Sequence, residues 1–235
     1  MNSSEPFFDF NAVWSSMPIL LKGFGIAMAC ATAAIIIAII LGLFVALMRL
    51  SKMKVLRWIA FVYTQFFRGI PLYVLIIWVY FGLAIAAGVN LPAIPAGIIT
   101  LALLNSGYLS ETFRSGILAV SKGQIEAGIA LGLSKREVMR HIVLPQALKV
   151  VIPPLGNQYV DAIKDTAILS IIGVPELMRE TKALANLYYQ PFEFYTFAGL
   201  LYLFAVLVVS RGVTELEKKL SAHSAQTPTA IEASN

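Results

Sequence analysis

Charged side chains interrupt an apolar stretch between residues 150 and 172. Asp161, Lys164 and Asp165 follow one another at spacings of three and one, so they share one face of a helix. The same surface is extended toward the N-terminus by two amides, Asn157 and Gln158. Carboxylates, an ammonium group and amides on one surface could bind a small molecule that is both ammonium and carboxylate, or relay an ion. This helix is therefore the first candidate for chemistry.

A second candidate is a charged stretch that runs from Glu126 to Pro145, EAGIALGLSKREVMRHIVLP. It predicts two short helices. Gly132 can adopt a positive φ that ends the first helix, and Ser134 is a natural N-cap for the second. Glu137, three residues later, completes a capping box. We expect the second helix to end at Pro145. From geometry alone, this stretch could also be an ordinary connector.

The composition places both candidates in a membrane protein. Of the 235 residues, 58% are hydrophobic and only 13% are charged, whereas soluble domains average about 25% charged residues. The net charge of +5 is better explained by Lys and Arg in cytoplasmic loops than by nucleic-acid binding. The single cysteine, Cys30, lies in an apolar run and predicts no disulfide or metal cluster.

Apolar runs of membrane-spanning length predict an all-α, polytopic bundle with five transmembrane helices. Residues 69–110 are too long for one span and are divided at the turn-forming stretch 88–95. The expected spans are 23–48, the two halves of 69–110, 150–172 and 194–210. Residues 55–68 are too short to cross and predict an aromatic-rich interfacial helix that ends before Gly69-Ile70-Pro71.

Basic residues set the expected orientation. With five alternating spans, one side of the membrane collects Arg49, Lys52, Lys54, Arg57, Arg68, Arg114, Lys122, Lys135, Arg136, Arg140, Lys149, Arg211, Lys218 and Lys219. The other side keeps Lys22, Arg179 and Lys182. The positive-inside rule then places the N-terminus outside and the C-terminus in the cytoplasm.

The same reasoning divides the chain into regions. We expect an extracytoplasmic segment (1–18), a transmembrane domain (19–218) with a cytoplasmic loop at about 115–148, and a disordered tail (219–235).

The spacing within the charged stretch resembles the EAA motif of ABC transporter permeases. In that motif EAA is followed by three residues, a Gly, nine residues and I-x-L-P, which matches Glu126-Ala127-Gly128, Gly132 and Ile142-Val143-Leu144-Pro145. Further pieces, in the same order as in the polar amino acid uptake branch, are FRGIP at 67–71, YLSETFR at 108–114, GQ at 123–124, LPQA at 144–147 and KDT at 164–166.

The resemblance implies a type I importer permease fold and a division of labour. The stretch from Glu126 to Pro145, which we call the hook, would couple to a separate dimeric ATPase through Glu126, Ala127, Gly128, Gly132, Ile142, Leu144 and Pro145. That partner would bind ATP and Mg²⁺, and this chain would need no cofactor. A second permease subunit and an extracytoplasmic amino-acid-binding protein would complete the assembly in the inner membrane. The chain itself has no P-loop, HExxH or GxSxG sequence, so we expect no enzymatic activity of its own.

Charges inside a bilayer cost at least ~2.5–3.5 kcal/mol each, which makes them candidates for a substrate path. We include Asn157, Gln158, Asp161, Lys164, Asp165 and Glu111 in that path. Lys164 could instead pair with Asp161 or Asp165 as a structural or gating contact. The family usually has a neutral residue at the position of Asp161, so an unpaired carboxylate there would favour a basic amino acid. Glu111 and Arg114 could form an intrahelical pair, and Arg68 is expected to anchor at the interface.

Two other functions remain open at the level of the sequence. An ion-gradient-driven transporter could use Asp161, Lys164 and Asp165 as a relay, but it would give the hook no purpose, and the chain has no internal repeat. A membrane scaffold without transport would leave the intramembrane charges unexplained.

Overall fold

The computed structural model of the protein describes residues 9–225, which fold into helices joined by short turns without a β-strand. Residues 1–8 and 226–235 lie outside this description. The α-helices are α1 (Asn11–Ser15), α2 (Met17–Leu50), α3 (Lys54–Gly69), α4 (Leu72–Ile77), α5 (Leu83–Ala87), α6 (Ala93–Leu118), α7 (Lys122–Ala130), α8 (Lys135–Val138), α9 (Leu144–Asp165), α10 (Leu177–Tyr188) and α11 (Pro191–Ala225). Wider π-helical turns occupy Trp78–Gly82 and Met139–Val143, and a 3-10 helix occupies Thr166–Ile172. The all-helical prediction is confirmed.

Three helices are long and apolar enough to cross a membrane: α2, α6 and α11. Helix α3 and the segment from Leu72 to Ala87 count as a fourth if the pair, which is bent by 105°, is one broken span. Helix α9 does not meet this criterion, because its charged and amide side chains lower its hydropathy. The count of five spans therefore stays a prediction.

The aromatic-rich segment after the first span forms a helix of its own, as its composition predicts. Helix α3 ends at Gly69, and the chain turns through Ile70 and Pro71 before α4 begins at Leu72. Pro71 has φ −57° and an extended ψ of 137°, so it cannot continue the helix. The bend of 105° lets α3 take a direction different from that of the following span.

Helices α2 and α6 pack closely at the centre of the bundle because Gly42 lets them approach. A Cβ on Gly42 would lie 2.9 Å from the Cβ of Leu109 and 3.1 Å from the backbone oxygen of Ser106. Helix α9 packs between α6 and α11 in the same manner. A side chain on Gly116 would overlap Val151, and one on Gly156 would overlap Val213. These close contacts hold α9 against both spanning neighbours.

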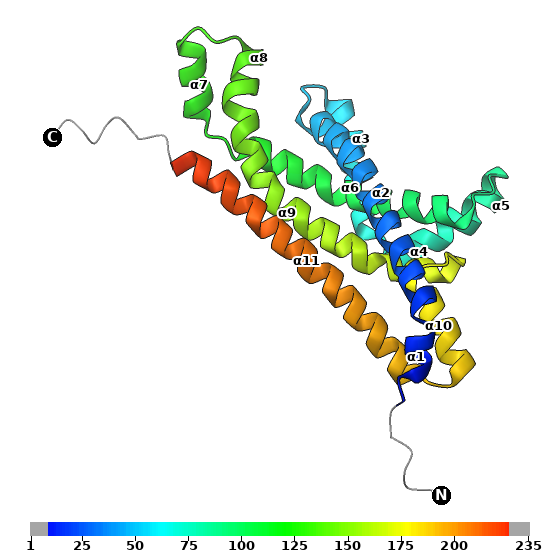
Figure 1. Ribbon diagram of the computed structural model, residues 1–235. Helices are drawn as coiled ribbons and strands as arrows, with labels where there is room; N and C mark the ends of the chain where they lie inside the picture. Colours follow the sequence, from blue (N-terminus) through cyan, green and yellow to red (C-terminus); the bar gives the residue numbers. More distant parts are fainter. Residues whose placement is uncertain (1–8, 226–235) are drawn as a thin grey trace, which may run out of the picture.

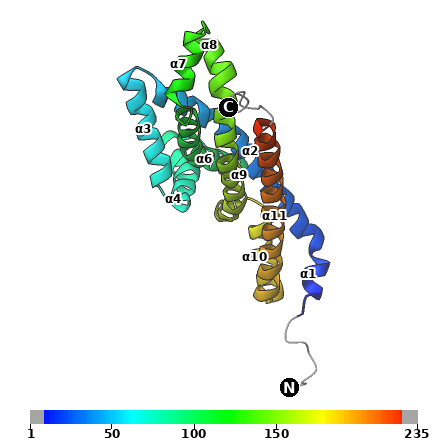
Figure 2. The same cartoon turned by 90° about the vertical axis from the view of Figure 1, so that its left-hand side faces the viewer.

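The two ends of the bundle carry different elements (Figure 1). Helices α7 and α8 project from one end, at which α2 also ends and α3 begins, whereas α1 and α10 lie at the opposite end. Viewed from the side, α3 and α4 lie on one flank and α11 on the other, with α9 between them (Figure 2). Most of the basic set from Arg49 to Lys219 belongs to the end of α2, to α3, to the hook and to the end of α11. Lys22 lies near the start of α2, and Arg179 and Lys182 lie in α10.

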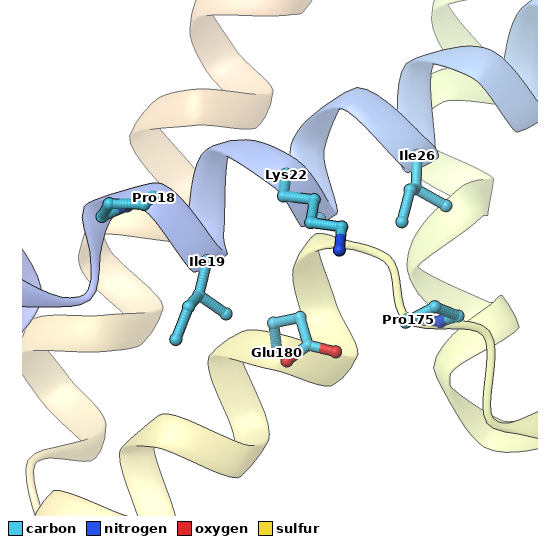
Figure 3. Close-up of a pocket in the computed structure, with 7 residues that line it drawn as sticks. Pro18, Ile19, Lys22, Ile26, Pro175 and Glu180 are labelled. Atoms are coloured by element: carbon cyan, nitrogen blue, oxygen red, sulfur yellow. The ribbon is translucent and has the colours of Figure 1, made fainter.

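Figure 3 shows a cavity of about 370 Å³ at that other end, lined by α2 and the start of α10. Lys22 of α2 and Glu180 of α10 lie on its facing walls. A Cβ on Gly23 would lie 3.0 Å from the backbone nitrogen of Leu177, so this glycine permits the contact between the two helices.

Two local predictions were wrong. The second hook helix does not end at Pro145, because the π-helical turn at Met139–Val143 widens the backbone just before the proline and α9 then continues. Helix α9 continues through Pro153 and Pro154 without a break. The disordered tail was predicted to begin at residue 219, which is too early, because α11 extends to Ala225. The rest of that tail, 226–235, lies outside the described residues.

Candidate functional site

The first hook helix, α7, ends in a Schellman motif centred on Gly132. Gly132 has φ +83°, as the sequence predicts. Its N–H donates to the carbonyl of Ile129 at 2.9 Å, and the N–H of Leu133 donates to the carbonyl of Gly128 at 3.1 Å. This pair of hydrogen bonds satisfies the last carbonyls of the helix and reverses the chain within a few residues. The turn between α7 and α8 is therefore fixed by backbone geometry.

The second hook helix, α8, begins with the predicted capping box. The hydroxyl of Ser134 accepts from the N–H of Glu137 at 3.3 Å, while the Glu137 carboxylate accepts from the Ser134 N–H at 2.8 Å. The Ser134 hydroxyl also donates to this carboxylate at 2.7 Å. These hydrogen bonds favour the ionised carboxylate, so they hold the pKa of Glu137 below its ordinary value.

The hook has a small apolar core of its own. Val120, Val138 and Val143 are buried in it, and Leu133 and Ile142 pack against them. A core of this kind lets so short a segment keep one shape at the end of the bundle. The hook is thus a folded unit with its own packing rather than a loose connector.

The structure divides the expected coupling residues into two groups. Glu126, Ala127, Gly132, Leu144 and Pro145 are exposed and available to a partner.

The remaining two residues of the motif face inward. Gly128 is buried, and a Cβ there would lie 2.5 Å from Cδ1 of Ile142 and 3.2 Å from a methyl group of Val138. The glycine at the third position of the motif thus makes room for Ile142 inside the hook.

A polar cavity of about 450 Å³ lies between α6 and α9. It brings together four of the residues that the sequence assigns to a substrate path, which are Glu111, Asn157, Gln158 and Asp161. Its other lining residues are Arg68, Tyr108, Thr112, Ser115 and Pro154. The cavity therefore offers one guanidinium group, two carboxylates, two amides and three hydroxyl groups.

Arg68, which we expected to anchor at the interface, lines this cavity. Its guanidinium carbon lies 5.1 Å from the centre of the Tyr108 ring, which allows a cation–π contact. A side chain on Gly107 would come within 3.2 Å of the Arg68 side chain, so the adjacent glycine leaves space for this arginine.

Asp161 is not the unpaired carboxylate that the sequence analysis considered. Its Oδ1 lies 2.8 Å from Nζ of Lys164, and both side chains are more than half exposed, at 52% and 54%. Such exposed pairs contribute about 0–1 kcal/mol, so a charged ligand could replace either partner. Lys164 and Asp165 do not line the polar cavity. Lys164 faces a separate hollow of about 300 Å³ toward α11, and Asp165 is half-buried.

Glu111 is held by two arginines. The expected pair with Arg114 is confirmed, with Nε of Arg114 2.8 Å from Oε2 of Glu111. Arg49, at the end of α2, donates to the other carboxylate oxygen at 3.1 Å. The second partner could not be predicted from helix spacing, because it comes from a different helix.

Asn105 is a further polar residue of this region that the sequence analysis missed. It is fully buried in α6, and its Oδ1 accepts a hydrogen bond of 2.7 Å from Nε2 of Gln158. Its own Nδ2 donates to the carbonyl of Leu101 at 2.6 Å. The signal was present, because an amide in an apolar span needs a partner. The bond fixes the Gln158 side chain at the wall of the cavity.

The comparisons with known proteins agree with these features. Residues 38–222 match the model of the family described as binding-protein-dependent transport system inner membrane component. The chain is 36% identical over 208 residues to the probable glutamine ABC transporter permease protein GlnM of Bacillus subtilis, which covers 88% of this chain and 96% of that protein. It is 34% identical over 215 residues to the arginine transport system permease protein ArtQ of the same species, with 92% and 98% covered.

Solved structures show the same fold. A crystal structure of an amino acid ABC transporter with histidines superimposes with a TM-score of 0.86 at 34% identity, and covers 91% of this chain and all of that one. An inward-facing MetNI methionine ABC transporter gives a TM-score of 0.75 at 18% identity, with 88% of this chain and 98% of that one covered, which shows likeness of fold. The chain therefore belongs to the family of binding-protein-dependent transport system inner membrane components, the permeases of ABC transporters.

Proposed function

We propose that this chain is the transmembrane permease subunit of an ATP-driven importer for a polar amino acid. One observation carries the proposal. The hook continues through the π-helical turn at Met139–Val143 into α9, and α9 supplies Asn157, Gln158 and Asp161 to the wall of the polar cavity. A displacement of the hook would thus be transmitted along one helix to the groups that face a substrate.

A separate ATPase would bind the exposed side of the hook through Glu126, Ala127 and Gly132. ATP and Mg²⁺ would be bound and hydrolysed there, since this sequence has no P-loop. Rigid-body rotation of the ATPase pair could move the hook and α9 together. The partner can drive the cycle only through its different affinities for the inward-open and outward-open states.

The assembly would contain two permease subunits, identical or closely related, each with five spans, the N-terminus outside and the C-terminus in the cytoplasm. α9 would serve as the fourth span, with its polar residues turned toward the shared path. An extracytoplasmic binding protein would deliver the amino acid at the end that carries α1 and α10.

The charges of the cavity suit an amino acid. Arg68 could bind the carboxylate, and Glu111 or Asp161 the ammonium group. Asp161, whose exposed pair with Lys164 a ligand could replace, is the residue that we assign to a preference for a basic side chain. Relatives named for glutamine and for arginine are both consistent with a polar amino acid.

The proposal is tested by affinity purification of the tagged chain from gently solubilised membranes of a cell that expresses its partners. A P-loop ATPase should co-purify with the wild type and be lost with Glu126→Lys. The matched control is Glu215→Lys, which changes an exposed glutamate of α11 outside the hook. Absence of an ATPase from the wild type would refute the proposal. Uptake driven by a proton or sodium gradient would then support the ion-relay alternative with Asp161, Lys164 and Asp165.

A further inference from the structure

A basic groove with an aromatic wall lies at the hook end of the bundle, apart from the polar cavity and from the hook. It has a volume of about 560 Å³ and is formed where α2 ends, α3 begins and α6 ends. Its lining residues include four cations, Arg49, Lys54, Arg57 and Arg114, and two aromatic residues, Trp58 and Phe61.

The cations of the groove are only partly neutralised. Glu111 is the carboxylate that pairs with Arg49 and Arg114, so four cations and one carboxylate leave a net charge of +3. Within the part of the chain that the structure describes, Lys54 has no carboxylate partner, and Arg57 reaches only the backbone oxygen of Ser51, at 3.4 Å.

Arg49 shows the clearest unused capacity for hydrogen bonding. One of its terminal nitrogens, Nη2, bonds Glu111, whereas Nη1 is buried and has no hydrogen-bond partner among the described residues. A buried donor without an acceptor destabilises the folded chain, and more so when the group is charged. Arg49 thus keeps a donor that Glu111 does not satisfy, on a side chain that lines the groove.

The aromatic wall indicates which kind of anion fits. Trp58 is 66% exposed and Phe61 is 47% exposed, and the guanidinium carbon of Arg49 lies 5.2 Å from the centre of the Phe61 ring. Trp residues concentrate at the level of lipid headgroups, where the ring lies between the polar and the apolar region. A soluble anion would gain nothing from this exposed apolar surface, whereas the acyl region of a phospholipid would cover it.

We propose that this groove binds the phosphate of an anionic phospholipid in the cytoplasmic leaflet. Arg49, Lys54 and Arg57 contact the phosphate, and the glycerol and upper acyl chain lie against Trp58 and Phe61. Basic pockets on the cytoplasmic side of membrane proteins bind anionic headgroups by this chemistry. The assignment to the cytoplasmic leaflet rests on the orientation given under the proposed function.

The binding test measures quenching of Trp58 by brominated lipids. Trp14→Phe and Trp78→Phe leave Trp58 as the single tryptophan of the full chain, which is reconstituted into vesicles. Brominated phosphatidylglycerol in a phosphatidylcholine background is compared with brominated phosphatidylcholine at the same mole fraction. Each Lys or Arg near the surface contributes ≈ 1 kcal/mol, so a relative binding constant of about 5 or more in favour of phosphatidylglycerol is expected.

Two variants of equal charge change locate the effect. Lys54→Gln with Arg57→Gln should lower the relative binding constant several-fold, while Lys218→Gln with Lys219→Gln should leave it unchanged. Equal quenching by both lipids in the parent protein would overturn the proposal. An equal decrease of the relative binding constant in both double variants would also overturn it. Absence of quenching by either lipid would also overturn it, because the groove would then be covered by protein.

A competition arm distinguishes the lipid from a soluble phosphate. Glycerol 3-phosphate and inorganic phosphate are added to the vesicles with brominated phosphatidylglycerol at constant ionic strength. Unchanged quenching supports a lipid site, and full recovery of fluorescence by millimolar phosphate would assign the groove to a soluble anion instead. None of these measurements needs the ATPase, so they can fail or succeed independently of the importer proposal.

Discussion

The left-handed turn at Gly132 allows the role of the hook to be tested by backbone strain alone. Gly132 has φ +83°, and a Cβ placed on it would meet no atom within 4 Å. A substitution there clashes with nothing inside the chain, so its cost within the chain comes from the backbone conformation. Val, Ala and Asn differ widely in how well they tolerate a positive φ, with Asn the most tolerant.

The expected magnitudes follow from that tolerance. An ordinary L-residue in the left-handed region costs roughly 1–2 kcal/mol, and a β-branched residue more. A cost of one or two kcal/mol changes the ratio of the folded to the open hook by a factor of about 5–30. Gly132→Asn should therefore transport almost as the wild type does, Gly132→Ala should be several-fold slower, and Gly132→Val should be the slowest.

The assay is ATP-driven uptake of a labelled amino acid into vesicles that contain the permease, its ATPase and the binding protein. Co-purified ATPase is quantified in the same preparations. Gly123→Val is the matched control, because Gly123 lies in the first turn of α7, also has no neighbour within 4 Å of a Cβ, and does not have a positive φ. The Gly123→Val variant should keep both the uptake rate and the amount of co-purified ATPase of the wild type.

Two results would refute this reasoning. An equal loss of uptake with Gly123→Val and Gly132→Val would show that any β-branched residue in this segment is harmful, whatever its φ. Equal loss with Gly132→Asn and Gly132→Val would show that steric contact with the partner, and not backbone strain, controls this position.

Three further outcomes are expected. Asp161→Asn should lower uptake of arginine or lysine relative to glutamine by about tenfold, the scale of one charge-assisted hydrogen bond, without loss of co-purified ATPase; an unchanged ratio of uptake rates would end its assignment to specificity. Because the pKa of Glu137 is lowered, the capping box should stabilise the hook fully above pH 4.5, the ordinary pKa, and less as the pH falls through the lowered value; amide hydrogen exchange in the hook should show this loss in the wild type but not in Ser134→Ala. Gly42→Ala should destabilise the protein by about 1–3 kcal/mol through overpacking, seen as a lower Tm in detergent, whereas Gly25→Ala, which meets no atom within 4 Å, should leave the Tm unchanged or raise it.

The features that the sequence predicts correctly are local. The positive φ of Gly132, the capping box at Ser134 and the helix break at Pro71 each depend on a few neighbouring residues and on backbone sterics. The long apolar spans are equally local, because each of them is predicted from one continuous run of uncharged residues. The EAA spacing joins these local signals into a pattern that identifies the family.

The errors arise where a distant residue or a compensating distortion decides the outcome. Pro145 ends a helix in isolation, but a preceding π-helical turn removes the clash and lets the hook continue into α9. Gly128 looks like a contact residue for a partner in the linear motif, yet the position of Ile142 turns it into an internal packing site. Neither fact is visible in the spacing of residues.

The same limit applies to Glu111. Helix spacing gives it one partner, Arg114, and the cation from α2, Arg49, enters only through the packing of α2 on α6. That second contact places one carboxylate at the boundary between two sites, since Glu111 lines the polar cavity while both of its arginines line the basic groove. A ligand that draws Arg49 toward the groove would weaken its hold on Glu111 and leave more negative charge facing the cavity. Lipid composition and substrate preference are therefore expected to be coupled through this one residue.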